Sequence, residues 1–96
     1  MNNYDAIRLT LAQLVRLLQE QGAHNWANAL ARNTAALEQA PRAGLDELLR
    51  CYGGNGSFND LVLSGVPVSV NEQLDQLRQR LFEQALAARQ ALCGNT

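Results

Sequence analysis

The sequence predicts an all-α protein, a compact bundle of four main helices with a glycine-rich loop and a short helical turn before the last and longest helix. Apolar residues recur at spacings of three and four along four separate segments, the pattern of helices with one buried face. Strand-like alternation occurs only briefly, over residues 66–70, and Pro67 interrupts it. With 96 residues, 47% of them hydrophobic and 18% charged, the composition is that of a globular protein, and we expect a single helical domain over residues 1–96.

The first predicted helix covers about residues 3–21 and the second about residues 25–39. Gly22 favours an end to the first helix. Pro41 ends the second, because the residue before a proline is pushed out of helical geometry. Asn33 lies on the apolar line of the second helix, where an unpaired amide would cost about 1–3 kcal/mol. We therefore expect Asn33 to be buried and bonded to loop backbone.

The third predicted helix is short, over about residues 43–52. Asp46 and Arg50 stand four residues apart in it, in the order that favours an ion pair on a helix surface. We expect this pair to be solvated and to contribute only about 0.3 kcal/mol.

The fourth predicted helix is the longest, over about residues 71–93. Ser69 followed by Glu72 is the pattern of a capping box at its start. Its apolar residues cover roughly half of the circumference, so we expect it to pack on two neighbours at once. The remaining charged residues alternate in sign and are expected to form a solvated face. They are Asp75, Arg78, Arg80, Glu83 and Arg89.

The expected core draws on all four helices and on the connection before the last one. It consists of Ile7, Leu11, Leu14, Leu18, Trp26, Leu30, Leu37, Leu48, Phe58, Leu61, Leu74, Leu77, Leu81 and Phe82. Leu9 falls on the polar face of the first helix, where it is either an ordinary exposed leucine or a partner contact.

The connection between the third and fourth helices is unlike the rest of the chain. Three of its residues within four positions are glycine, which is used where backbone must turn or approach something closely. Ser57 followed by Asp60 predicts a short helical turn starting at Phe58. The segment is either a tight connection that folds back on the bundle or a loop presented to a partner. In the second case the candidate binding residues are Tyr52, Asn55, Ser57, Phe58, Asn59 and Asp60, with Phe58 as the anchor.

Charge and hydropathy argue against several classes of partner. The formal net charge is −1 and the chain has no lysine, so it lacks the positive field that attracts nucleic acid. Its apolar runs are far shorter than the roughly 20 residues of a membrane helix. The first residues have neither a basic stretch nor an apolar core, so we expect no signal peptide and a cytoplasmic location.

The residues that usually carry chemistry are sparse and scattered. A P-loop needs a lysine after its last glycine, and a dinucleotide fold needs a preceding strand, so the glycines do not predict a nucleotide site. His24, Cys51 and Cys93 have no metal-ligand spacing, and we expect the two cysteines to be reduced and mostly buried. We therefore expect no catalytic residue, metal or other cofactor.

Residues 52–63 read Tyr-Gly-Gly-Asn-Gly-Ser-Phe-Asn-Asp-Leu-Val-Leu, and this stretch, the 52–63 segment, resembles the recurring Y-G-G-x-G-S-F-N-D-L-V-L motif of a family of small, uncharacterised bacterial helical proteins. Trp26-Ala27 near the start of the second helix and the spacing of Asn71 and Leu74 in the last are similar to that family as well. The resemblance implies a bacterial cytoplasmic protein and no catalytic residue. Small proteins of this type often serve as immunity proteins against secreted toxins, an analogy of size and style.

Three functional hypotheses remain open. The first is a protein-binding module, most concretely an immunity protein that occludes the active site of a cognate toxin. The second is a small-ligand or enzymatic protein with a closed pocket under the glycine loop, where Asn33, Ser57, Asn59 and Asp60 would converge. The third is a purely architectural role for the motif, in which Asn59→Ala would unfold the protein. The sequence leaves the oligomeric state open.

Overall fold

The computed structural model describes residues 3–53 and 58–94. Its elements in chain order are α1 (Asn3–Glu20), α2 (His24–Gln39), α3 (Pro41–Arg50), a 3-10 turn η1 (Phe58–Asp60), and α4 (Val68–Gly94). These described residues form helices and connections without a strand, which confirms the predicted all-α class and the short helical turn before the longest helix.

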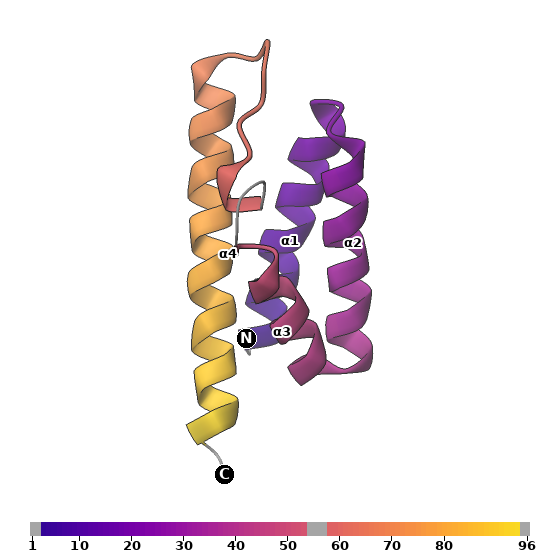
Figure 1. Cartoon of the computed structure of the whole chain (residues 1–96), viewed down its shortest axis with the longest axis vertical. Coiled ribbons are helices and arrows are strands. Elements are labelled where there is room, and N and C mark those ends of the chain that lie inside the picture. Colours follow the sequence, from indigo (N-terminus) through magenta and orange to yellow (C-terminus); the bar gives the residue numbers. More distant parts are fainter. Residues whose placement is uncertain (1–2, 54–57, 95–96) are drawn as a thin grey trace.

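The four α-helices contact one another in a ring. Helices α1 and α2 run antiparallel, α3 turns back beside α2, and α4 lies along the opposite side of the bundle (Figure 1). Helix α1 packs against α2 and α4, and α3 packs against α2 and α4. Helix α4 therefore has two helical neighbours, as its wide apolar arc predicted. Its 27 residues make it the longest element of a molecule that measures 47 × 24 × 21 Å.

Gly22 ends α1 as predicted. Its φ of 79° is left-handed, a conformation that glycine adopts without a steric penalty. The Gly22 amide donates to Gln19 O at 3.1 Å and the Ala23 amide donates to Leu18 O at 2.8 Å. These two bonds form a Schellman motif, which satisfies carbonyls that the helix end would leave unpaired.

The α2–α3 corner is tighter than the sequence suggested. Pro41 follows the end of α2 and is also the first residue of α3, so α3 begins two residues earlier than predicted. A proline fits there because the first helical N–H has no partner within the helix. A Cβ at Gly44 would lie 2.7 Å from Leu37 N, so only glycine lets the two helices approach this closely.

Helix α4 begins at Val68, three residues before the predicted start. Ser69 lies inside the helix, so the predicted capping box with Glu72 is wrong. Asn71 instead accepts from Leu63 N at 2.9 Å and donates to Leu63 O at 3.0 Å. This pair of bonds ties the incoming connection to the first turn of the helix.

Most of the expected core is confirmed. Eleven of the fourteen predicted core residues are buried, with Phe58 fully enclosed. Trp26 and Leu61 are only partly buried, and Phe82 is 36% exposed, so its prediction as a core residue is corrected. Leu9 is 56% exposed, on the polar face where its register placed it. Leu45, Leu17, Ala27, Ala85 and Ala88 complete the core.

The charge pairs differ from those predicted. Arg50 Nε donates to the backbone oxygen of Asp46 at 3.4 Å, so the two side chains make no direct contact. The Asp46 carboxylate instead accepts a 2.7 Å hydrogen bond from Arg89 Nε, which connects α3 to α4. This bond lowers the pKa of Asp46 below its ordinary value of 3.8, and the Arg50 charge also lowers it. Arg89 is therefore not part of a simply solvated face.

Over the part of the chain that the structure describes, no helix is long and apolar enough to cross a membrane. In the same residues, no three His, Cys, Asp or Glu side chains lie close enough together to hold a metal ion.

Candidate binding site

The described residues 58–63 of the 52–63 segment lie against the bundle after the end of α3. The Phe58 amide donates to Cys51 O at 2.8 Å, which closes the loop at its base, and η1 follows at once. The Phe58 ring is fully buried between the rings of Trp26 and Tyr52, with centroid distances of 5.2 Å and 5.6 Å. This burial confirms the expected core position of Phe58. In this arrangement its ring presents no surface to a partner.

Four of the five aromatic residues of the chain form one continuous row. It runs from Trp26 of α2 through Phe58 and Tyr52 to Phe82 of α4. The ring centroids of Tyr52 and Phe82 are 5.0 Å apart, within the range of favourable aromatic pairs. The row links α2 to α4 through the 52–63 segment. Phe82, at its outer end, lies partly in solvent.

Arg78 of α4 holds residues 58–61 in place. Its Nη1 donates to Phe58 O at 2.9 Å and to Leu61 O at 2.7 Å, the carbonyls of the first residue of η1 and of the residue that follows it. Its Nη2 donates to Asp75, which supplies the counter-charge. Because the Arg78 side chain is only 11% exposed, these bonds are partly shielded from water. The prediction that Arg78 belongs to a solvated face is therefore wrong.

Tyr52 also forms a hydrogen bond with Arg78. Its hydroxyl donates to the backbone oxygen of Arg78 at 2.6 Å. Burial raises the pKa of the Tyr52 phenol above its ordinary value, although the Arg78 charge acts in the opposite direction. The phenol therefore stays protonated near neutral pH and remains a donor. Arg78 thus contacts Tyr52 through its backbone oxygen, and Phe58 and Leu61 through its guanidinium.

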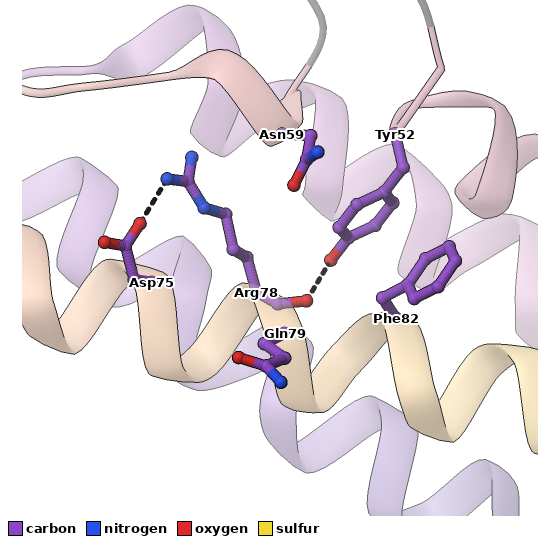
Figure 2. A pocket seen from close by; sticks show the side chains of 6 residues that line it. All are labelled: Tyr52, Asn59, Asp75, Arg78, Gln79 and Phe82. Carbon is purple, nitrogen blue, oxygen red and sulfur yellow. Dashed lines mark hydrogen bonds and ion pairs between the residues drawn. The ribbon is translucent and has the colours of Figure 1, made fainter.

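A pocket of about 500 Å³ opens to solvent between the 52–63 segment and α4. Its lining residues, shown in Figure 2, are Tyr52, Asn59, Asp75, Arg78, Gln79 and Phe82. The exposed Asn59 amide makes no hydrogen bond with any part of the chain that the structure describes. Gln79 uses only its Nε2, which donates to Glu83 at 3.2 Å. The pocket therefore has aromatic and polar walls with hydrogen-bonding capacity left for a ligand.

Comparison with protein-family models identifies the family of this chain. The model described as Domain of unknown function (DUF6966) matches residues 19–69, just over half of the sequence. The chain belongs to the DUF6966 family. Comparisons with curated proteins and with solved structures find no match. The DUF6966 match contains Tyr52 and Asn59, whereas the wall that α4 contributes to the pocket lies beyond it.

The sequence-predicted site residues of this DUF6966 protein fall in different places. Tyr52 and Asn59 line the pocket, and Phe58 lies behind it in the core. Asp60 is exposed and does not line the pocket. The two remaining predicted residues, Asn55 and Ser57, lie outside the described residues.

Asn33 does not join Asn59. It is buried, and its Nδ2 lies 3.6 Å from the sulfur of Cys51, a half-buried free thiol whose Sγ is 3.5 Å from Glu47 O. The described partner of the Asn33 amide is thus a side chain, in place of the predicted loop backbone. The other cysteine side chain, of Cys93, lies outside the described residues.

The sequence prediction missed the α4 wall of the pocket, formed by Asp75, Arg78, Gln79 and Phe82. One signal for it was present. Arg78 lies four residues after Leu74 and four before Phe82, so it belongs to a row flanked by residues expected in the core. A charged residue in such a row is a candidate for a buried contact with a neighbouring segment.

Proposed function

We propose that this DUF6966 protein is a non-catalytic protein-binding module whose partner contacts the pocket between the 52–63 segment and α4. One observation carries the proposal: Asn59 stands at the pocket with an exposed amide that serves no described contact within the fold, although its neighbours are held in place. Phe58 and Tyr52 account for the folding role of the segment. Asn59 makes no such contact in the described part of the chain, and exposed polar groups on a connection that a helical scaffold positions are typical of recognition.

The more specific form of the proposal is an immunity protein in a bacterial cytoplasm that neutralises a cognate toxin by occluding its active site. Occlusion needs a surface of fixed shape and no reacting group of its own. The Arg78 bonds to Phe58 and Leu61 support such a fixed surface. With a formal net charge of −1, the partner would be recognised through local contacts, because long-range steering is weak.

A second candidate function is the binding of a small ligand in the same pocket. The volume of about 500 Å³ is in the range of small-molecule sites, and aromatic walls with a few polar groups are typical of them. The small-ligand hypothesis from the sequence expected a closed pocket, whereas this pocket is open to solvent. The openness favours a protein partner that covers the pocket. A small ligand would raise the melting temperature of the isolated protein, and this rise would separate the two functions.

Affinity capture with a matched pair of variants tests the proposal. Gln79→Arg places a long charged side chain at the pocket, and Gln13→Arg makes the same change at an exposed position of α1. A specific partner should be captured by the wild type and by Gln13→Arg, and should be lost with Gln79→Arg. Equal capture by all three proteins would contradict a partner site at the pocket.

Protection of cells tests the immunity form of the proposal. Co-expression of the wild type with the toxic product of a neighbouring gene should restore growth, and Gln79→Arg should restore it less well than Gln13→Arg. Absence of protection against every such product would contradict the immunity role while leaving protein binding to be judged by capture.

A further inference from the structure

We infer that the pocket between the 52–63 segment and α4 receives one uncharged aromatic side chain with a polar edge, a tryptophan or a tyrosine, from the partner protein. The inference rests on the proposed function and specifies the chemistry of the same site. It follows from the shape of the walls, from their charge balance and from the positions of the free hydrogen-bonding groups.

The walls suit a flat group. Figure 2 shows the Tyr52 ring on one side of the pocket, with Phe82 beside it, and the Arg78 side chain on the other. Aromatic rings accept another ring in tilted or offset contact, and a guanidinium plane stacks on a ring face. A planar side chain can therefore contact both walls, which a branched aliphatic side chain does less completely.

The charge balance favours an uncharged occupant. Asp75 is 62% exposed and Arg78 is 11% exposed, and the two form an ion pair along the pocket wall. A cationic side chain would have to compete with Arg78 for the Asp75 carboxylate, and an anionic side chain would have to compete with that carboxylate for Arg78. A charged occupant would therefore lose its hydration without gaining a net attraction, a cost that a neutral occupant avoids.

The polar groups select the edge of the occupant. The Asn59 amide and Gln79 Oε1 have no described protein hydrogen bond and lie on the pocket lining, one contributed by η1 and the other by α4. They offer both acceptors and donors to an indole N–H or a phenol O–H. Tryptophan, tyrosine and arginine are the residue types most frequent at energetic centres of interfaces. Because an arginine would compete with Arg78 for Asp75, tryptophan or tyrosine is favoured.

Binding of single capped amino acids to the folded, isotope-labelled full chain tests the inference by two-dimensional ¹H–¹⁵N NMR. N-acetyl-tryptophanamide and N-acetyl-tyrosinamide should shift the signals of Asn59, Gln79 and Phe82, including both side-chain amides. Since each compound has few atoms, the dissociation constants should be about 1–10 mM. N-acetyl-argininamide and N-acetyl-leucinamide should bind at least about fivefold more weakly.

A matched set of variants links the signal to the site. The double change Asn59→Ala and Gln79→Ala should weaken binding of N-acetyl-tryptophanamide about threefold or more. Gln90→Ala, at another exposed position of α4, should leave the affinity unchanged. Melting curves of all three proteins should coincide within a few degrees, so that a loss of binding reflects the pocket.

The outcomes are distinct. Stronger binding of N-acetyl-argininamide at the same signals would overturn the inference and leave the protein-binding proposal intact. Shifts confined to residues away from the pocket, or no shifts with any compound at 20 mM, about twice the weakest expected constant, would overturn it too. The proposed function is judged separately, by partner capture with Gln79→Arg.

Discussion

The two sides of the 52–63 segment differ in what their residues do. On the inner side, the Phe58 ring is fully buried, and the carbonyls of Phe58 and Leu61 accept from Arg78. On the outer side, Asn59 is exposed at a pocket and its amide makes no described contact within the chain. Phe58 and Asn59 are neighbours in sequence, yet one is fixed by the core and the other faces solvent.

This difference separates residues that build the segment from residues that are free to contact another molecule. An aromatic ring at 0% exposure stabilises the fold whatever the protein does. An exposed amide with no described partner in the fold adds little to stability and is free to contact another molecule. Substitutions on the two sides should therefore change different quantities.

Phe58→Ala should cause the largest loss. It removes a fully buried ring that contacts Trp26 and Tyr52, so it loses both hydrophobic burial and two aromatic contacts. We expect the free energy of unfolding to fall by about 3–5 kcal/mol in urea titrations. The control is Leu9→Ala, at a 56% exposed leucine, which should cost less than about 0.5 kcal/mol. A similar loss for both variants would show that Phe58 is not a core residue.

Arg78→Gln should have the second largest effect. The glutamine is too short to reach Phe58 O and Leu61 O together, so at least one carbonyl loses a charge-assisted hydrogen bond. We expect a loss of about 2–3 kcal/mol, with faster amide hydrogen exchange in η1. Arg80→Gln, on the exposed side of the same helix, should change stability by less than about 0.5 kcal/mol. Equal losses would mean that Arg78 acts only as a surface charge.

Local physical rules predicted much of this fold. The spacing of Leu11, Leu14 and Leu18 placed the buried face of α1, and Gly22 marked its end. The turn at Phe58 followed from the Ser57–Asp60 pattern. Each of these features depends on residues within about one or two helical turns, where intrinsic preferences and hydrophobic periodicity are informative.

The missed features depend on contacts between distant parts of the chain. Arg78 binds carbonyls 17 and 20 residues earlier, and Arg89 binds Asp46 across 43 residues. A helical wheel shows such arginines at the edge of the apolar face without showing which backbone they meet. The α4 wall of the pocket was missed for the same reason: Asn59 was predicted as a site residue, but the wall opposite it depends on how two segments pack.

Asp46→Asn should have a smaller effect that depends on pH. The hydrogen bond from Arg89 lowers the pKa of the Asp46 carboxyl in the folded protein below 3.8. Its contribution is therefore present above that pH and is lost as the pH falls through the folded-state pKa. We expect Asp46→Asn to lower the melting temperature by about 1–3 °C at pH 7, and we expect its difference from the wild type to shrink as the pH falls below 3.8.

High salt provides the control for Asp46. At about 1 M NaCl and pH 7, screening should reduce the difference between Asp46→Asn and the wild type, because the Asp46 side chain is 43% exposed. The loss caused by Arg78→Gln should persist, since the Arg78 side chain is mostly buried against backbone carbonyls. An equal response of both variants to salt would contradict the distinction between the two arginines.

Asn59→Ala should have the smallest effect on stability. Because the amide is exposed and makes no described bond within the chain, its removal should change the free energy of unfolding by less than about 0.5 kcal/mol. If the residue served the fold alone, the variant would unfold at a clearly lower temperature than the wild type. A full melt beside an assay with a captured partner therefore separates the architectural role from recognition. Unchanged melting with at least about tenfold weaker partner binding would assign Asn59 to the interface, since a well-placed polar contact at an interface centre carries that much.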